Sequence, residues 1–454
     1  MAQLTGERTK AADLGGPEPL LEVVSAQKRG EARGMFSVCS AHPVVLRCAL
    51  EQALEDGTSA LVESTSNQVN QEGGYTGIRP AEFAAFVFRL ATEAGLPPER
   101  VVLGGDHLGP HPWRAEGATI AMERAIEMVR QYVQAGYAKI HLDASMTCAG
   151  DPPGPLDDAV AAARAAVLAA AAEAACRGRR PPVYGVGTEV PSPGGQAGAH
   201  AGPAVTRASD AERTLHILRE AFARRGLERA WERVIALVVQ PGVEFGDDVV
   251  FAYRREEAAG LKAFAETQDR LVYEAHSTDY QAEGALRALV TDHYAILKVG
   301  PELTFAFREA VFSLEEIERE LLGHRNPGRL SCLRAALDGA MRRDPRHWEA
   351  FYDGEEDEQR LRRAWSLSDR ARYYWAQPEV AAALERLFAN LEARSLPQGL
   401  VSQYLPGAVD LARDTPAREL PGRAARLHVR RVLQRYARAC RPTTAGVSDG
   451  RESP

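Results

Sequence analysis

Eight short apolar runs recur along the chain, and helix-like segments separate most of them. The runs are 35–40, 60–64, 101–106, 139–144, 183–189, 234–240, 271–276 and 295–300. Apolar runs of this length, bounded by turn residues, are typical of buried strands. Strands that alternate with helices predict βαβ units and a parallel sheet. Eight units over roughly 290 residues predict an α/β fold, a closed (β/α)₈ TIM barrel somewhat larger than the usual ~250 residues.

The spacing of apolar residues predicts where the helices lie. Helical periodicity or alanine-rich composition marks 80–94, 118–135, 157–176, 211–225, 256–267, 281–291 and 304–322. From about residue 325 the alternation stops, and only helices are expected, at 330–342, 358–365, 370–375, 378–393 and 421–437. We therefore predict a disordered leader (1–19), a TIM barrel (20–325), a helical C-terminal extension (326–440) and a disordered tail (441–454).

Composition excludes several classes of function. The formal net charge is −7, so the basic patch of a nucleic-acid-binding protein is not expected. The six cysteines lack CxxC spacing, which is typical of reduced thiols in a long chain. No signal-like segment starts the sequence, and the alanine-rich stretch 158–176, the nearest to a membrane span, carries charges. We expect a cytoplasmic protein with no nucleic-acid or membrane partner.

Polar residues stand at or just beyond the end of every apolar run. They are Ser40, His42, Glu63, Asn67, Asp106, His107, Asp143, Ser145, Glu189, Gln240, His276, Asp279 and Lys298. In a TIM barrel the carboxyl ends of the strands form the site. An open doubly wound sheet would collect its ligands at one switch point and not from all eight strands. The pattern therefore favours a barrel with a functional site at its mouth.

Three of these residues predict a metal site. His107, Glu189 and His276 end the third, fifth and seventh runs, so they should converge on one side of the barrel mouth. Two imidazoles and a carboxylate with an open position form a divalent metal site of the catalytic type. Any one of them alone is more simply a hydrogen-bonded loop residue. Zinc is the first choice of metal, with manganese and nickel as alternatives.

Asp106 and Asp143 are the candidates for proton transfer, together with Glu189. Adjacent side chains alternate along a strand, so Asp106 should point in a different direction from His107, as an orienting group or a general acid/base. Asp143 could bind a sugar hydroxyl or hold a ligand in place. For Ser145, substrate binding competes with the simpler role of N-cap for the next helix.

The remaining polar residues are predicted to contact substrate. They are Glu63, Asn67, Gln240, Asp279 and Lys298. A lysine on a buried strand could form a Schiff base, but anion binding or an ion pair with Glu189 or Asp143 fits a metal site better. The segment 191–203, rich in glycine and alanine, is either a lid over the site or a tolerated insertion.

Several stretches together resemble one protein family. They are 37–43, 64–71, 104–110, 141–145, 187–191, 240–245, 274–280 and 298–301. They are similar to the GatZ/KbaZ family, the so-called non-catalytic subunit of class II D-tagatose-1,6-bisphosphate aldolase. The resemblance implies a TIM barrel, a role in galactitol, tagatose or amino-sugar catabolism, and a catalytic class II aldolase subunit as partner. It further implies a ketose or ketose phosphate as ligand and an oligomeric assembly. Family members are also catalogued as tagatose-6-phosphate kinases, but no kinase-type nucleotide motif is present.

A more distant resemblance links the chain to the catalytic class II aldolases. Asp106-His107 resembles their Asp-His pair, in which the acid transfers protons and the histidine binds zinc. Glu189 stands where their second metal histidine follows a Gly-Thr dipeptide, and His276 resembles their third. Ser277–Asp279 stands where their phosphate-binding glycines are expected. Two interpretations follow: an accessory aldolase subunit, or a metal-dependent enzyme that cleaves ketoses or, alone, acts as a tagatose/fructose 4-epimerase.

Overall fold

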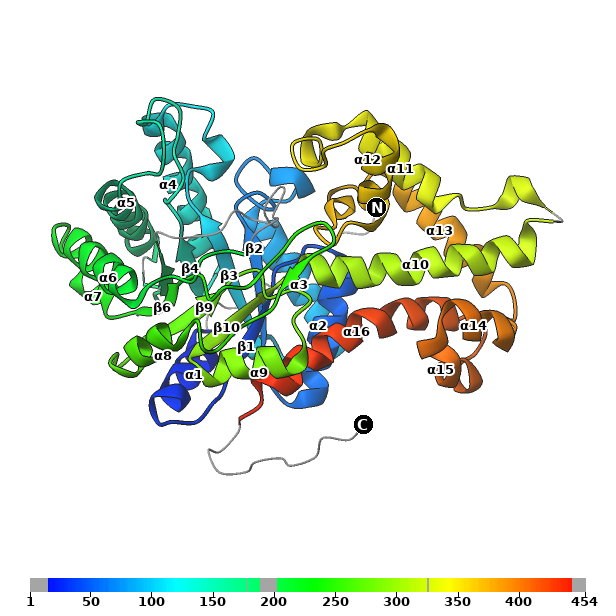
Figure 1. The fold of residues 1–454 in the computed structure, drawn as a ribbon, viewed down its shortest axis with the longest axis horizontal. Helices are drawn as coiled ribbons and strands as arrows, with labels where there is room; N and C mark the ends of the chain where they lie inside the picture. Colours follow the sequence, from blue (N-terminus) through cyan, green and yellow to red (C-terminus); the bar gives the residue numbers. More distant parts are fainter. Residues whose placement is uncertain (1–14, 177, 188–201, 325, 443–454) are drawn as a thin grey trace.

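A computed structural model describes residues 15–176, 178–187, 202–324 and 326–442. Eight parallel strands close into a barrel in the order β1-β10-β9-β6-β5-β4-β3-β2. Their bounds are β1 Met35–Val38, β2 Ala60–Thr65, β3 Val101–Leu108, β4 Lys139–Leu142, β5 Val183–Val186, β6 Val234–Val238, β9 Val272–Ala275 and β10 Tyr294–Val299. Because β1 pairs with both β2 and β10, no edge is left open. The predicted (β/α)₈ barrel is confirmed (Figure 1).

Helices surround this barrel and connect its strands. They are α2 Pro43–Asp56, α3 Pro80–Ala94, α4 Ala118–Gln134, α5 Asp158–Cys176, α6 Ala208–Ala223, α7 Glu228–Trp231, α8 Ala259–Glu266, α9 Glu283–Thr291 and α10 Pro301–Leu322. A short hairpin, β7 Glu244–Phe245 with β8 Val250–Phe251, interrupts the connection after β6. The predicted helices lie close to these bounds, whereas α2, the one-turn helix α7 and the hairpin were not predicted.

The alanine-rich helix α5 is the one described helix that is long and apolar enough to cross a membrane. In the fold it lies in the outer ring and contacts α4 on one side and α6 on the other. Of its most apolar stretch, 56% is buried inside the protein. Packing between two neighbouring helices therefore accounts for its composition.

The barrel interior consists of two chemically different layers. Its floor is an apolar cluster that includes Leu61, Val102, Val183, Val272 and Ile296, and α1 (Glu18–Lys28) covers the floor from below with Leu20, Val23 and Val24. Two residues further along the same strands stand Glu63, Gly104, Gly185, Glu274 and Lys298. Side chains alternate across a strand, so positions two apart share a face. On β2, β9 and β10 the interior therefore changes from apolar to charged over two residues, whereas β3 and β5 contribute glycines at that level.

The C-terminal extension packs closely against the barrel. After α10 come α11 Leu333–Arg343, α12 Glu356–Trp365, the short helix η7 Arg370–Tyr373, α13 Pro378–Glu392, α14 Gln398–Tyr404, α15 Val409–Asp414 and α16 Leu420–Cys440. The last helix, α16, returns to the barrel and contacts α2, α9, α10 and β1 (Figure 1). The predicted leader and tail lie outside the described residues, except that α1 already begins at Glu18 and that Arg441 and Pro442 follow α16.

Candidate functional site

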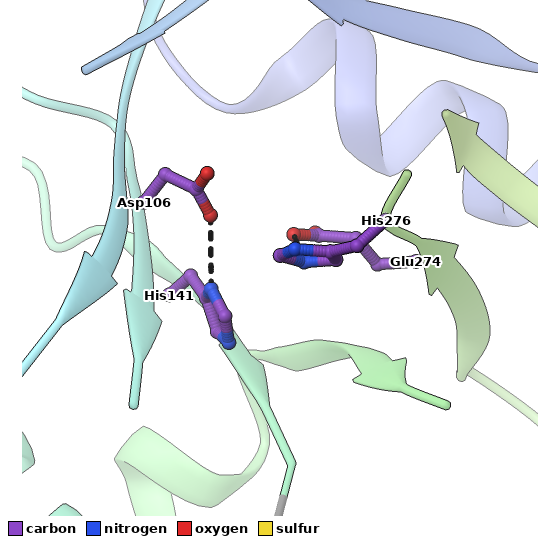
Figure 2. A group of neighbouring side chains, drawn as sticks. All are labelled: Asp106, His141, Glu274 and His276. Carbon is purple, nitrogen blue, oxygen red and sulfur yellow. Dashed lines mark hydrogen bonds and ion pairs between the residues drawn. The ribbon is translucent and has the colours of Figure 1, made fainter. Parts of the chain in front are cut away.

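Four buried side chains gather at the carboxyl ends of three barrel strands. They are Asp106 on β3, His141 on β4, Glu274 on β9 and His276 directly after β9 (Figure 2). One nitrogen or oxygen atom from each lies within 4.8 Å of the corresponding atoms of the others. Two imidazoles and two carboxylates at this separation could hold a divalent metal ion.

A third imidazole stands beside this cluster. The ring centroid of His107 lies 4.7 Å from that of His276 and 5.2 Å from that of His141, and the His141 and His276 centroids are 5.3 Å apart. Burial lowers the pKa of His276 to about 4, so its ring is neutral at pH 7 and retains a lone pair. The buried Nε2 of His141 makes no hydrogen bond within the described part of the chain. Both imidazoles are therefore suited to bind a metal ion.

The backbone at Asp106-His107 departs from regular strand geometry. His107 has a φ of +49°, in the left-handed region, and the pairing of β3 with β4 shifts register between Gly105 and Leu108. A bulge of this kind redirects side chains. Both Asp106 and His107 consequently line the same pocket at the barrel mouth. The prediction that strand alternation would point them in different directions was wrong, because it assumed regular pleating.

Asp143 orients His107. Its Oδ2 lies 2.8 Å from His107 Nδ1, and its Oδ1 accepts hydrogen bonds from the backbone N–H and the hydroxyl of Ser145, the latter at 2.7 Å. Burial alone would lower the pKa of His107, but Asp106 and Asp143 raise it. Ser145 does not cap the next helix, since α5 begins only at Asp158. It instead fixes the carboxylate that holds His107.

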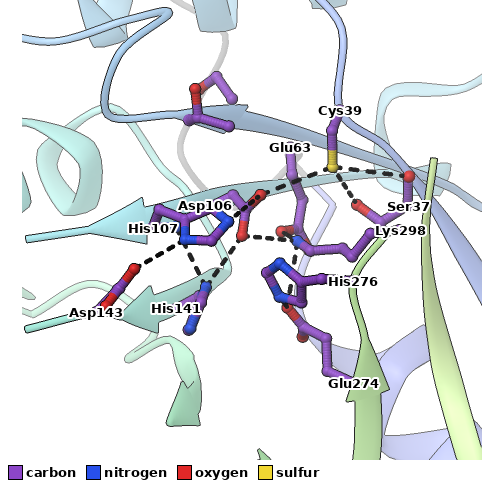
Figure 3. A network of polar contacts seen from close by, with 12 residues as sticks. Ser37, Cys39, Glu63, Asp106, His107, His141, Asp143, Glu274, His276 and Lys298 are labelled. Atoms are coloured by element: carbon purple, nitrogen blue, oxygen red, sulfur yellow. Dashed lines mark hydrogen bonds and ion pairs between the residues drawn. The ribbon is translucent and has the colours of Figure 1, made fainter. Parts of the chain in front are cut away.

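Two lysines balance the carboxylates beneath the cluster. Lys139 Nζ lies 2.8 Å from Glu63 Oε1 and 2.7 Å from Glu274 Oε2, and all three side chains are fully buried. Lys298 Nζ lies 3.0 Å from Asp106 Oδ1 and 3.2 Å from Glu274 Oε1, and it also contacts Glu63 (Figure 3). Three carboxylates thus share two ammonium groups. One negative charge remains in excess before any metal is considered.

The pKa shifts follow from this pairing. Burial would raise the pKa of Asp106, but Lys298 and His107 hold it well below its usual value. Burial would likewise lower the pKa of Lys298, but Asp106 and the neighbouring acids raise it well above its usual value. A lysine held in its charged form is a poor Schiff-base nucleophile. The prediction that Lys298 could pair with Asp143 was wrong, because Lys298 pairs with Glu63, Asp106 and Glu274 instead.

Gly104 provides the space for this buried network. A Cβ atom added there would lie 2.6 Å from Glu63 Cγ. Any larger residue would displace the Glu63 side chain from between the two lysines. The second glycine of the Gly104-Gly105 pair is equally confined, since a Cβ at Gly105 would lie 2.5 Å from a methyl carbon of Leu108. Both glycines are therefore required by close packing at this position.

The mouth pocket brings together about half of the sequence-predicted site residues. The predicted residues that line it are Asn67, Asp106, His107, His276, Asp279 and Lys298. Glu63 lies below the pocket floor in the lysine network and does not line it. The predicted ligand Glu189, and the lid segment as far as residue 201, lie outside the described residues.

Two predicted substrate contacts have structural roles in loops. Gln240 Oε1 accepts hydrogen bonds from the backbone N–H groups of Gly242 and Val243, so it shapes the loop after β6. Asp279 Oδ1 accepts hydrogen bonds from the N–H groups of Gly300 and Glu302, at the start of α10. Burial and the nearby Glu302 raise the pKa of Asp279 to about 7.

Sequence reasoning missed His141 and Glu274. Both lie two residues from another polar residue of the same apolar run, in the pairs Lys139/His141 and Glu274/His276. A two-residue spacing puts both members of a pair on one face. This signal was present in the sequence, but attention to the last polar residue of each run excluded its inward-facing neighbour.

Comparison with known proteins extends this description. The fold and cluster define a (β/α)₈ barrel protein with a buried group of possible metal ligands at its mouth. Residues 20–441 match the family described as D-tagatose-1,6-bisphosphate aldolase subunit GatZ/KbaZ-like. The chain belongs to this family.

Individual relatives agree with the family match. The D-tagatose-1,6-bisphosphate aldolase subunits GatZ of Salmonella enteritidis and Klebsiella pneumoniae are each 47% identical over 426 residues, which is 93% of this chain and 100% of theirs. A crystal structure of a probable tagatose 6 phosphate kinase from Sinorhizobium meliloti is 44% identical, with a TM-score of 0.80. The match covers 90% of this chain and 100% of that one.

Proposed function

We propose that this chain is the GatZ/KbaZ-type subunit of a D-tagatose-1,6-bisphosphate aldolase and works with a catalytic class II aldolase subunit in carbohydrate catabolism. The observation that carries the proposal is the match at 47% identity along the full length of subunits with that name. The match extends through the helical extension to residue 441. The proposal therefore concerns the whole protein, including the extension.

We further propose that the mouth cluster binds a divalent metal. Asp106, His141, Glu274 and His276 offer nitrogen and oxygen ligands, and His276 is neutral at pH 7. The excess negative charge of the surrounding network favours a cation. Imidazole and carboxylate ligands suit zinc, with nickel and manganese as alternatives. Such a metal would supply a Lewis acid for a substrate carbonyl oxygen.

The residues around the cluster are suited to ketose chemistry. Asp106 lines the pocket and is ionised at neutral pH, so it can accept a hydrogen bond from a sugar hydroxyl. Asp143 holds the His107 ring in one orientation. Lys298 remains charged beside Asp106, and its positive charge keeps the Asp106 carboxylate ionised. These groups can bind and orient a ketose or ketose phosphate at the barrel mouth.

Two other functions have less support. The kinase name of the Sinorhizobium meliloti protein has no counterpart in a nucleotide-binding motif here, since the sequence contains no P-loop. The Salmonella enteritidis and Klebsiella pneumoniae relatives are named aldolase subunits, so they give no support to a stand-alone ketose 4-epimerase. The aldolase-subunit function is the one on which family, fold and site chemistry agree.

The direct test uses the full chain with and without a catalytic class II aldolase subunit. We expect the two chains to co-purify, and D-tagatose 1,6-bisphosphate cleavage to be faster or longer-lived in the pair than in the catalytic subunit alone. The His276→Ala variant reports whether the metal cluster contributes to that effect. The His216→Ala variant is a matched control, because His216 is largely exposed on α6.

Two results would count against this proposal. Failure of the two chains to associate, with no change in cleavage rate or lifetime, would remove the subunit function. Turnover of D-tagatose to D-fructose by the metal-loaded chain alone would instead restore the epimerase interpretation. The His276→Ala variant in the same assay then shows whether the mouth cluster carries that turnover.

Metal titration can separate the two possible ligand sets. The sequence predicts His107, Glu189 and His276, whereas the structure brings Asp106, His141, Glu274 and His276 together. We expect Glu274→Gln to weaken zinc binding, as measured by competition with a chromogenic chelator. A loss of affinity in Glu189→Gln but not in Glu274→Gln would restore the predicted set.

A further inference from the structure

An arginine of the C-terminal extension reaches into the barrel-mouth pocket. Arg372 lies in η7, some 70 residues after β10, yet it lines the same pocket as His276 and Lys298. Tyr373 and Tyr75 line the pocket beside it, with ring centroids 4.5 Å apart. The extension therefore contributes directly to the site and does not merely cover it.

The charge of Arg372 has no carboxylate partner within ion-pair distance in the described part of the chain. The carboxylate of Asp369, three residues earlier, has other partners: its Oδ1 lies 2.8 Å from Arg308 Nε, and its Oδ2 accepts a hydrogen bond from Thr304 at 2.5 Å. Lys298 differs in this respect, because three acids surround it. Arg372 is thus the cation of the pocket that is not neutralised.

The guanidinium is held in place by neutral acceptors. Its Nη1 donates to the carbonyl oxygens of Ser368 and Asp369, and its Nη2 donates to the hydroxyl of Tyr373 at 2.9 Å. A guanidinium carries five N–H donors. Among the described residues, the Nε–H and the second Nη2–H have no acceptor. A pair of N–H groups from these two nitrogens matches a carboxylate or phosphate that accepts two parallel hydrogen bonds.

The loop that carries Arg372 is fixed to the barrel mouth. The N–H of Leu367 donates to the carbonyl oxygen of Asp247 at 2.8 Å. The carbonyl oxygen of Leu367 accepts a hydrogen bond from the Tyr280 hydroxyl at 2.6 Å. Ser366 donates its hydroxyl to Asp247 Oδ1 at 2.7 Å. The buried Arg308–Asp369 pair anchors the same loop to α10. Arg372 is therefore preorganised and needs little ordering when a ligand binds.

Other groups near Arg372 do not supply an anion site. The N–H groups of Gly300 and Glu302 at the start of α10 already donate to Asp279. The segment Ser277–Asp279 lacks the glycines of a phosphate loop. Among the described residues that line the pocket, His107 and Lys298 are paired with acids, so Arg372 is the cation best placed to recognise an anion.

We propose that Arg372 binds the anionic terminal group, a phosphate or a carboxylate, of the sugar that occupies the barrel mouth. The proposal rests on the proposed ketose-binding function and identifies what selects the substrate. Asp106 and His276 of the cluster line the same pocket as Arg372, so a sugar can place its carbonyl beside the cluster and its charged end at Arg372. Arg372 is a specificity-determining residue contributed by the extension.

Equilibrium binding by calorimetry tests this assignment on the full chain. The probes are inorganic phosphate, D-tagatose 1,6-bisphosphate, D-galacturonate and uncharged D-tagatose. Arg372→Gln removes the charge and keeps a hydrogen-bond donor, and Arg372→Lys keeps the charge without the fork. Arg346→Gln is the matched control, since Arg346 belongs to the same extension but is 73% exposed and pairs with Asp344.

We expect Arg372→Gln to weaken binding of the preferred anionic probe by roughly tenfold or more, as loss of a charge-assisted pair of hydrogen bonds implies. Arg372→Lys should lie between Gln and the wild type, and Arg346→Gln should match the wild type. If Arg372→Gln loses more affinity for the phosphate probes than for D-galacturonate, the anion is a phosphate. The opposite order identifies a carboxylate. Binding of D-tagatose should not change.

Three results would overturn the assignment. The first is a folded Arg372→Gln protein that binds every anionic probe as tightly as the wild type. The second is an equal loss of D-tagatose binding, which would mean that the loop and not the charge was altered. The third is a wild-type chain that binds none of the anions. Inorganic phosphate is measured without metal or partner, so its result stands even if the aldolase-subunit function fails.

Discussion

The floor and the mouth of the barrel are built from the same strands but are stabilised by different interactions. On β2, β9 and β10, Leu61, Val272 and Ile296 face the floor, and two residues later Glu63, Glu274 and Lys298 face the mouth. Both layers are almost entirely buried. The floor is stabilised by removal of apolar surface from water, whereas the mouth holds ions that must be paired to be tolerated at all.

This difference shows where stability and function reside. A floor residue can be replaced by another apolar residue of similar volume at little cost. A mouth residue cannot be replaced singly, because each lysine contacts more than one acid. Buried ion networks are weak evidence of a selected gain in stability. Their presence in this half of the barrel supports a functional role.

The largest loss of stability is expected at Lys139. The side chains of Lys139, Glu63 and Glu274 are all fully buried. The Lys139→Met variant leaves the two glutamates with only Lys298 as a positive partner. Removal of one partner of a buried pair costs about 3–5 kcal/mol. Urea unfolding of the wild type and the variant measures this loss.

The control for Lys139 is an exposed lysine. Lys262→Met breaks an (i, i+4) pair with Glu266, which is half exposed, so it should cost no more than about 0.5 kcal/mol. The double variant Lys139→Met/Glu274→Gln should recover part of the loss, because it removes the unpaired charge. A loss below about 1 kcal/mol for Lys139→Met would show that the mouth tolerates unpaired ions.

A substitution in the floor should lower the stability of the protein without changing its metal affinity. Leu61 is 1% exposed, and Leu61→Ala should cost about 2–4 kcal/mol through lost burial and a cavity. Because Leu61 lies below the charged layer, metal affinity should match the wild type when it is measured on folded protein at low temperature. A parallel loss of metal affinity would mean that the two layers are mechanically coupled.

A substitution of a proposed ligand in the mouth should, in contrast, lower the metal affinity. His141→Ala removes a proposed ligand whose Nε2 has no hydrogen bond within the described residues. We expect zinc affinity to fall by more than the roughly 10- to 100-fold that loss of an outer hydrogen-bond partner costs. Ser145→Ala frees only Asp143 and, through it, His107, which are not in the proposed ligand set, so its zinc affinity should stay close to that of the wild type. Chelator competition ranks the two variants, and equal losses would remove His141 from the ligand set.

The fold was largely readable from the sequence because its signal is repeated. Each of the eight apolar runs became a barrel strand, and the wholly apolar character of runs such as 234–238 reflects burial on both faces. The helix α2 and the short hairpin escaped prediction because the first begins within a motif that looks like a loop and the second has only two residues in each strand.

The site was less predictable because its geometry depends on departures from regularity. The positive φ of His107 turns two consecutive residues toward one pocket, and strand alternation predicts the opposite. The partners of Lys298 come from β2, β3 and β9, so only the closed barrel brings them together. No local pattern could place Arg372 in the pocket, since it is positioned by the packing of the extension onto α10.

The smallest expected effect concerns the rim between the mouth and the extension. Burial and Glu302 raise the pKa of Asp279 to about 7, against an ordinary value of 3.8. Between these values the folded protein binds a proton that the unfolded chain does not, so stability is greater at the lower pH and falls as pH rises through 7. From pH 6 to pH 7 the loss due to Asp279 should be about 1 kcal/mol.

The Asp279→Asn variant isolates this contribution. The asparagine carbonyl oxygen can still accept from Gly300 and Glu302, but it does not titrate. The difference in free energy of unfolding between wild type and variant cancels the other titrating groups, and it should move against the wild type as pH rises from 6 to 7. A difference that stays constant would place the pKa of Asp279 well below 6. The rim would then behave like the charged mouth, where neighbouring cations keep buried acids ionised, and not like a layer in which burial keeps an acid protonated.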